Sequence, residues 1–529
     1  MDAKETTEPV RSLDRRAFLT RSGVIGAGML AAGVMPRAVR EVAAQVRRDR
    51  PAITDGVASG DVSARRAVVW ARADRPSRML VEVSPTTSFR HPRRYLGPLA
   101  TEYTDFTAQA DLTGLPVGRD IFYRVRFQQL DNPAIVGEGV VGHLRTAPDE
   151  PRDVSFTWSG DTAGQGWGIN PEFGGMRIYE SMRALRPDFF IHSGDTVYAD
   201  GPIPEMQPLP DGGVWRNVTT EEKSKVAETL HEFRGNYRYN LLDGNVRALN
   251  AEVPIFAQWD DHETLNNWYP GEVLEDERYR VRNVNLLARR AKRAFHEYMP
   301  VREIAAEYGR IYRKVSYGPL LDVFFLDMRT YRGPNTENTQ DQRSRLTAIL
   351  GRHQLRWLQH SLLASRATWK VIASDMPLGL VVPDGDLFEA VANDDEGAPL
   401  GRELELASLL RFVARWEVDN LVWLTADVHY TAAHYYDPRK AAQPNFTGFW
   451  EFVSGPLNAG GFGPNELDAT FGPQVRFAKA PEIPNAPPSS ESQFFGHVRI
   501  AGDSRVMTVD LKNLDGQTLY SVDLRPAAG

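Results

Sequence analysis

The sequence predicts a layered α/β domain preceded by a small all-β domain of immunoglobulin or fibronectin type. Two observations predict this order. Short runs with period-two alternation fill the region before about residue 146, and continuous apolar runs separated by helix-length segments follow it. The 529 residues, 42% hydrophobic and 25% charged, are enough chain for two or three domains that bury a core without cross-links.

The composition excludes several classes of protein. The chain has no cysteine, which rules out a thiol nucleophile, a zinc ribbon and an iron–sulfur site. The 62 basic side chains are outnumbered by 69 acidic ones, so the net charge is −7 and no global positive field exists. We therefore expect no stable nucleic-acid complex, and we expect a monomer.

The first 44 residues have the features of a twin-arginine signal peptide. Arg15 and Arg16 precede Phe18, and a weakly apolar stretch follows at 23–35. Thirteen residues span about 20 Å as a helix, too short for a bilayer and typical of a signal-peptide core, although a buried helix is the alternative. We expect export by the twin-arginine machinery, a secreted, periplasmic or cell-wall location, and no transmembrane segment after processing.

The all-β domain is predicted at 50–148. Its alternating runs lie at 66–72, 78–83 and 121–127, with Gly, Pro and Asp between them. This pattern is typical of a β-sandwich, but it does not indicate a function. A short linker at 147–152 leads into the predicted catalytic domain at 152–525.

The second domain contains apolar runs that end in polar turns. Such runs predict strands covered on both faces, and amphipathic segments supply the cover. The predicted strands are 154–158, 189–191, 255–257 and 420–424, and the predicted helices are 220–233, 284–299, 341–365 and 404–416. The segment 480–492, rich in Pro, Asn and Ser, is predicted to be an irregular loop.

Acidic and imidazole side chains follow four of these strands. They are Asp161, Asp195, Asp261 with His262, and Asp427 with His429. In layered α/β folds ligands bind at the carboxyl ends of strands, so these groups can converge. One such Asp is more often a helix cap or a turn residue. Several buried together require a compensating cation, so the set predicts a metal site.

The order of these motifs resembles a known family. The motifs are Gly160-Asp161, Gly194-Asp-Thr-Val-Tyr198, Trp259-Asp-Asp-His-Glu263 and Ala426-Asp-Val-His429, with Gly56-Val-Ala-Ser-Gly-Asp61 before them. Together they resemble the PhoD-like alkaline phosphatase and phosphodiesterase family of the calcineurin-like metallophosphoesterases over nearly the whole chain. The resemblance implies a four-layer αββα sandwich. It also implies a secreted enzyme that hydrolyses phosphomonoesters or phosphodiesters by direct attack of a metal-bound hydroxide.

The resemblance also implies two metals that share Asp195. The two sets of ligands would be Asp161, Asp195, Tyr198 and His429 for one metal, and Asp195, Asp261 and Asp427 for the other. It implies Fe³⁺ on the tyrosine side and Ca²⁺ on the all-oxygen side, with Mn²⁺ or Zn²⁺ as alternatives. Where the family has a cysteine ligand, this chain has Asp161, and Tyr198 could instead be a packing aromatic.

Further residues are candidates for contact with the substrate. His262 is placed to protonate the departing alkoxide, with a buried structural histidine as its alternative. Asn267 could contact phosphate, and so could its neighbour Asn266. Arg234 and Arg329 are candidate phosphate clamps because a guanidinium matches phosphate oxygens in a bidentate manner. For both arginines an ordinary salt bridge is an equal alternative.

Two other functions remain open at this point. One is a phospholipase D-type phosphodiesterase, for which phospholipids replace small phosphate esters as the substrate. The other is a non-catalytic exported binding protein with structural calcium. The second alternative leaves His262 and Tyr198 without a role.

Overall fold

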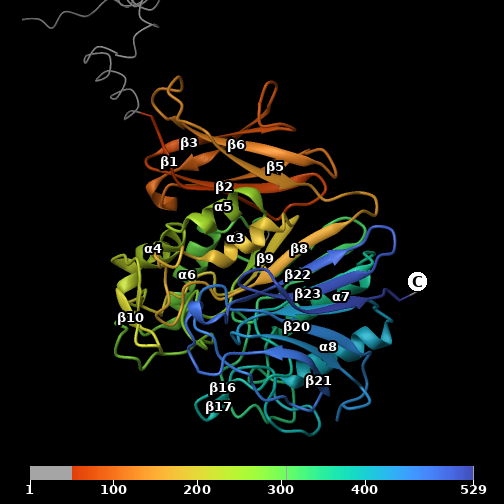
Figure 1. Cartoon of the computed structure of the whole chain (residues 1–529). Helices are drawn as coiled ribbons and strands as arrows, with labels where there is room; N and C mark the ends of the chain where they lie inside the picture. Colours follow the sequence, from red (N-terminus) through yellow and green to blue (C-terminus); the bar gives the residue numbers. More distant parts are fainter. Residues whose placement is uncertain (1–49, 305–306, 528–529) are drawn as a thin grey trace, which may run out of the picture. The chain divides into compact units, whose positions relative to one another are not determined.

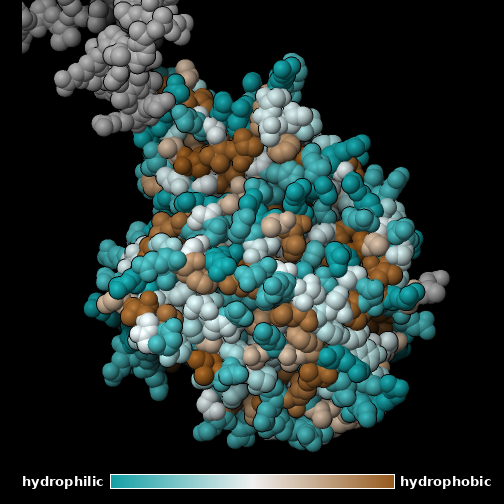
Figure 2. Space-filling model, viewed as in Figure 1, coloured by the Kyte–Doolittle hydropathy of each residue, from teal (hydrophilic) through white to brown (hydrophobic). Residues whose placement is uncertain are grey.

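The computed structural model describes residues 50–304 and 307–527. The predicted signal peptide at 1–44 lies outside the described residues. All elements below belong to the compact unit Pro51–Gly529. Among its described helices none is long and apolar enough to cross a bilayer. The face in Figure 2 is mostly hydrophilic, and its apolar residues form separate patches.

The largest element is a nine-stranded mixed sheet (Figure 1). Its order is β24-β23-β22-β8-β9-β12-β1-β2-β5. The bounds are β24 Thr518–Leu524, β23 Met507–Asn513, β22 Phe494–Ile500, β8 Val154–Ser159, β9 Phe189–Ser193, β12 Ile255–Gln258, β1 Ile53–Gly60, β2 Arg66–Ala73 and β5 Thr107–Thr113. The neighbours β8, β9 and β12 run parallel, so their carboxyl ends meet at one edge.

A second sheet has seven strands in the order β13-β14-β15-β18-β20-β19-β21. The bounds are β13 Arg313–Ser316, β14 Leu321–Phe325, β15 Trp369–Ala373, β18 Leu421–Thr425, β20 Phe449–Val453, β19 Thr431–Tyr436 and β21 Pro473–Lys479. Strands β14, β15, β18 and β20 are parallel to one another. The loops also contain two short antiparallel hairpins. One pairs β10 Met206–Pro208 with β11 Val214–Arg216, and the other pairs β16 Pro383–Asp384 with β17 Leu387–Phe388.

The two sheets and their helices form four layers. Because successive side chains of a strand face opposite sides, Phe189 joins the core between the sheets and Phe190 joins the core beneath the helices. Phe256 of the first sheet meets Phe325 of the second with 6.2 Å between ring centroids. Helices α3 Arg177–Ala184, α4 Leu230–Asn240, α5 Gly244–Glu252 and α6 Val284–Tyr298 cover one side, and α7 Gly351–Ala364 and α8 Glu403–Arg415 the other. The predicted αββα sandwich is confirmed.

Two of the four predicted helices differ from the structure at their ends. The helix predicted at 220–233 is wrong: only a short 3-10 turn, η2 Glu222–Ser224, lies near its start, and α4 begins after Thr229, which forms a capping box with Glu232. The helix predicted from residue 341 begins at Gly351, where Glu405 accepts the backbone N–H groups of Ile349 and Leu350. The helices predicted at 284–299 and 404–416 are confirmed, and 480–492 is irregular apart from η3 Pro488–Ser490.

The N-terminal strands form a sandwich that is joined to the larger sheet. Strands β1, β2 and β5 face a four-stranded sheet of order β4-β3-β6-β7, with β4 Arg93–Ala100, β3 Ser77–Ser84, β6 Asp120–Gln129 and β7 Val140–Arg145; η1 Glu102–Thr104 precedes β5. Strand β1 pairs with β12 through Gly60 and Ile255. A Cβ on Gly60 would lie 2.4 Å from the carbonyl oxygens of Ile255 and Pro300, so only glycine allows this approach. Independent folding of 50–148 stays a prediction.

A buried ion pair fixes this junction. Arg313 of β13 donates from Nη2 to Asp61 Oδ1 at 2.7 Å and from Nε to Asp61 Oδ2 at 2.9 Å, and both side chains are buried. The backbone N–H of Arg302 also donates to Asp61. The carboxylate of the Gly56–Asp61 motif is therefore a structural anchor between the N-terminal strands and the second sheet.

We expect Arg313→Met to lower the free energy of unfolding by about 3–5 kcal/mol, because it leaves the Asp61 carboxylate buried without its cation. Thermal and urea unfolding of the purified protein measure this loss. The control is Asp515→Asn, which breaks the exposed 3.1 Å pair with Arg177 and should cost less than ~1 kcal/mol. Equal losses in the two variants would contradict the assignment.

Candidate metal centre

The chain turns sharply at the ends of three of the four strands that carry a predicted ligand. Asp161, Asp195, Asp427 and His429 all adopt positive φ, at 69°, 49°, 69° and 61°. Residues other than glycine rarely take this conformation, and where they do so in a cluster it is typical of functional sites. The turns bring side chains from β8, β9 and β18 to the same edge of the two sheets.

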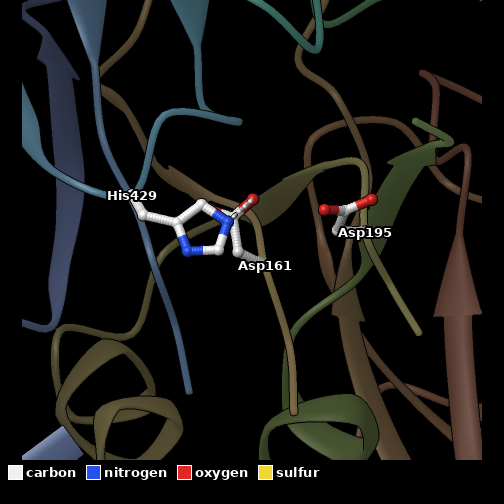
Figure 3. Close-up of side chains that lie close together, drawn as sticks. All are labelled: Asp161, Asp195 and His429. Atoms are coloured by element: carbon white, nitrogen blue, oxygen red, sulfur yellow. Dashed lines mark ion pairs between the residues drawn. The ribbon is translucent and has the colours of Figure 1, made fainter. Parts of the chain in front are cut away.

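The structure brings five of the predicted residues together in two groups. In one group, ligand atoms of Asp161, Asp195 and His429 lie within 4.8 Å of one another, and in the other those of Asp195, Asp261 and His262 do. Figure 3 shows the first group, in which the His429 imidazole reaches Asp161 and the Asp195 carboxylate lies beside them. Asp195 belongs to both groups, as expected of a shared ligand.

Tyr198 completes the first group. Its hydroxyl lies 2.9 Å from Nε2 of His429, and its side chain is 1% exposed. Burial and the charge of Asp195 raise the pKa of the Tyr198 phenol well above its usual range. Lys223 holds the loop by donating from Nζ to the Tyr198 carbonyl at 2.6 Å. The phenol hydroxyl is thus aimed at the cluster.

Asp427 lies at the cluster but in neither group of three. Its backbone N–H bonds to the Asp161 carboxylate, and its own Oδ1 lies 3.7 Å from Nη2 of Arg329. The Asp427 side chain is 12% exposed, more than the 1% of Asp161. In this structure its carboxylate faces Arg329 instead of meeting Asp195 and Asp261.

The donor set fits a pair of cations. Among the described residues, Asp161 Oδ2 and Asp261 Oδ1 are buried and have no hydrogen-bond partner. Burial and neighbouring carboxylates raise the pKa of Asp161 and Asp195 well above the usual range. Burial lowers the pKa of His429 to about 4, which keeps its imidazole neutral and able to coordinate. Cations would satisfy the orphaned oxygens and compensate the mutual repulsion.

His262 is oriented by a residue that the sequence reasoning missed. Its Nδ1 lies 2.7 Å from Oδ1 of the buried Asp200, and Asp200 Oδ2 accepts the N–H of Asn266. The opposite ring nitrogen, Nε2, therefore faces Asp261 at 3.9 Å. Burial lowers the pKa of His262, but Asp200 and Asp261 outweigh it and bring the pKa to about 10. The contact with Asp200 thus leaves Nε2 of His262 on the side of the cluster.

We expect Asp200→Asn to lower kcat by about 10²-fold, because the imidazole loses both its orientation and the charge that keeps it protonated. Metal content, measured by elemental analysis, should not change, since Asp200 belongs to neither group of ligands. Asp211→Asn, in the exposed turn before β11, is the control and should leave kcat unchanged. A wild-type kcat in Asp200→Asn would contradict the role of Asp200 in positioning His262.

Arg329 is not exposed for phosphate binding. Its side chain is completely buried, with Nη2 at 2.6 Å from Asp260, Nε at 3.5 Å from Asp375, and a further ion pair to Glu389. Arg329 therefore forms buried salt bridges, and the prediction that it binds phosphate is wrong for this structure. Sequence reasoning missed these acidic partners, although Asp375 follows the apolar strand β15 in the same way as the predicted ligands follow theirs.

Arg234 and Asn267 also have other partners. Arg234 of α4 makes a bidentate ion pair with Glu297 of α6 at 2.6 and 2.7 Å and donates to the Tyr103 carbonyl, so it joins helices instead of facing the cluster. Asn267 reaches the site through its backbone N–H, which bonds to Asp261 Oδ2 at 2.5 Å. Its side chain turns to Asp384 at 3.0 Å. Neither side chain contacts the proposed ligands.

Comparisons with known proteins agree with this geometry. The PhoD-like phosphatase family matches residues 156–511, and the N-terminal domain of PhoD-like phosphatases matches residues 38–148. Alkaline phosphatase D of Bacillus subtilis (strain 168) is 26% identical over 485 residues, covering 87% of this chain and 79% of that protein.

Solved structures show the same fold. A structure of PhoD superposes with a TM-score of 0.67 at 20% identity, covering 89% of each chain. The purple acid phosphatase PPD1 from yellow lupin (Lupinus luteus) seeds has a TM-score of 0.56 at 12% identity, covering 91% of this chain and 75% of that one. With a family match over most of the sequence and a clustered donor set, the chain belongs to the PhoD-like phosphatase family and is a phosphoric ester hydrolase.

Proposed function

We propose that this protein is an exported metallophosphoesterase that hydrolyses phosphomonoesters and phosphodiesters at the cluster around Asp195. The observation that carries the proposal is the membership of Asp195 in both groups of ligand atoms. A carboxylate shared in this way suits a two-cation clamp on the attacking and leaving oxygens of a phosphate ester. The likeness to alkaline phosphatase D supports the same reaction class.

The residues divide the work of the reaction. Asp161, Asp195, Tyr198 and His429 would hold one cation, and Asp195 with Asp261 the other, for which we propose Fe³⁺ and Ca²⁺. Two such cations would supply the Lewis acidity that direct attack on phosphorus without a phospho-enzyme requires. His262, held by Asp200, donates its Nε2 proton to the departing oxygen.

The stereochemistry of the reaction tests direct attack. A phosphate diester made chiral at phosphorus should give product with inverted configuration, because one in-line displacement inverts the centre. A phospho-enzyme requires two displacements and would give retention, which would contradict the proposal. Chelation of the metals should abolish turnover of p-nitrophenyl phosphate, and readdition should restore it.

The identity of the metals is tested by elemental analysis with an absorption spectrum. A Tyr198 phenolate on Fe³⁺ absorbs visible light, so the native protein should be coloured. A colourless protein with stoichiometric zinc would overturn the iron assignment and leave the phosphoesterase assignment standing. Release of choline from phosphatidylcholine by the purified enzyme would extend its substrates to phospholipids.

Export by the twin-arginine route is supported by Arg15, Arg16 and the short apolar stretch after them. Replacing both arginines with lysine should retain the full-length protein in the cytoplasm of the producing cell. Cell fractionation measures this outcome, and unchanged export would contradict it.

A further inference from the structure

A hollow of about 670 Å³ between α7 and α8 is lined by four arginines. They are Arg343, Arg345, Arg352 and Arg356, and the hollow also contains Gln359, Ser408 and Glu405. Glu405 is the single acidic residue among its described lining residues. The local charge of the hollow is therefore positive by three, in a chain whose net charge is −7.

Most of this positive charge is uncompensated. Arg343 lies 3.7 Å from Glu405 and donates to Ser408 at 3.3 Å. The side chains of Arg345, Arg352 and Arg356 are exposed, and among the described residues they have no ion-pair or hydrogen-bond partner.

The positions of these arginines are electrostatically unfavourable without an anion. Arg352 and Arg356 are one turn apart on α7, where like charges repel, and Gln359 continues the same stripe. Arg352 also lies in the first turn of α7, where the helix dipole disfavours a cation. The backbone N–H groups at the start of α7 already donate to Glu405. The site is therefore formed by the arginines and not by the helix terminus.

The hollow is connected to the loop that follows the proposed ligands. Nη2 of Arg345 lies 3.7 Å from the position that a Cβ would take on Gly271. Gly271 is four residues after Asn267, whose N–H bonds to the Asp261 carboxylate. A second contact joins the loop before α7 to the loop after Asp261, because the side-chain amide of Asn335 donates to the Asn267 carbonyl at 3.1 Å.

We propose that this arginine hollow binds a chain of several phosphate groups and anchors polymeric phosphate substrates. A guanidinium fork matches two oxygens of one phosphate, so three unpaired forks suit successive phosphates better than one isolated anion. Only the anchoring role rests on the proposed phosphoesterase function; binding at the hollow does not require turnover.

The test compares two double variants of the full-length holoenzyme, kept in millimolar calcium so that the probe does not strip the site. The probe is end-labelled linear polyphosphate, followed by fluorescence anisotropy. Arg352→Ala/Arg356→Ala should raise Kd at least ~10-fold, because two forks are lost. Arg65→Ala/Arg289→Ala removes two exposed, unpaired arginines elsewhere and should leave Kd unchanged.

Two further measurements separate the proposal from its alternatives. Polyglutamate of matched length should bind more weakly than polyphosphate; equal affinity would overturn the phosphate assignment. The inhibition constant of polyphosphate against a small phosphate ester should rise in the hollow variant, while KM for the small ester stays constant. Equal Kd values in the hollow variant, the control and the wild type would overturn the proposal even if the enzyme is fully active.

Discussion

Asp195→Asn is expected to lower kcat for phosphate esters by at least ~10³-fold, the largest effect on activity of any substitution considered. Asp195 is common to the two groups of ligand atoms, so its loss weakens both positions at once. Asparagine has nearly the same shape but no charge, and it cannot compensate two cations. Turnover of p-nitrophenyl phosphate and metal content by elemental analysis measure the effect.

A matched control lies at the opposite end of strand β9. Asp188 directly precedes β9, is also buried, and binds the Ser155 N–H at 2.9 Å and Arg145 at 3.2 Å. Asp188→Asn should reduce stability and leave kcat per folded molecule near the wild-type value. If Asp195→Asn reduced only stability and the wild type turned over no phosphate ester, structural calcium would be the better explanation.

The sequence predicts the layers because their signals are local. The continuous apolar run at 189–191 indicates a strand buried on both faces, and the structure confirms this, because Phe189 lies in one core and Phe190 in the other. The start of α7 is different, because Gly351 begins the helix only where Glu405, more than fifty residues later, caps it. A single-sequence pattern contains no signal for such a contact.

The candidate site shows the same division between local and distant signals. Asp161, Asp195, Asp261 and His429 could be predicted because each follows an apolar strand in a recognisable motif. Asp200 was missed because its role depends on the distance to His262 and not on its own neighbours. The arginines Arg234 and Arg329 failed as phosphate clamps for the opposite reason: residue type suggested a ligand, and burial beside acids decided otherwise.

Burial also determines the second large effect. Arg329 is fully enclosed by Asp260, Asp375 and Glu389, with Asp427 at 3.7 Å. Burial lowers the pKa of its guanidinium, but the carboxylates of Asp260 and Glu389 outweigh this and raise the pKa well above its usual range. The guanidinium is the positive centre on which several buried carboxylates depend.

Arg329→Met is therefore expected to lower the free energy of unfolding by at least about 3–5 kcal/mol, because it leaves buried carboxylates without their shared cation. A total stability of roughly 5–15 kcal/mol could lose much of its margin, so the soluble yield should fall as well. Arg329→Lys keeps the charge but loses the planar fork, so its free energy of unfolding should lie between those of Arg329→Met and the wild type.

Kinetics of the folded lysine variant distinguish this structural role from phosphate binding. An arginine that holds the acidic side chains in place should, when changed to lysine, lower the melting temperature and leave KM for a phosphate ester close to the wild-type value. An arginine that contacts the ester should do the reverse, raising KM at constant melting temperature. The second result would return Arg329 to the substrate. The first result, a lower melting temperature at constant KM, would show that the Arg329 guanidinium holds the buried carboxylates of Asp260, Asp375 and Glu389 in their observed positions.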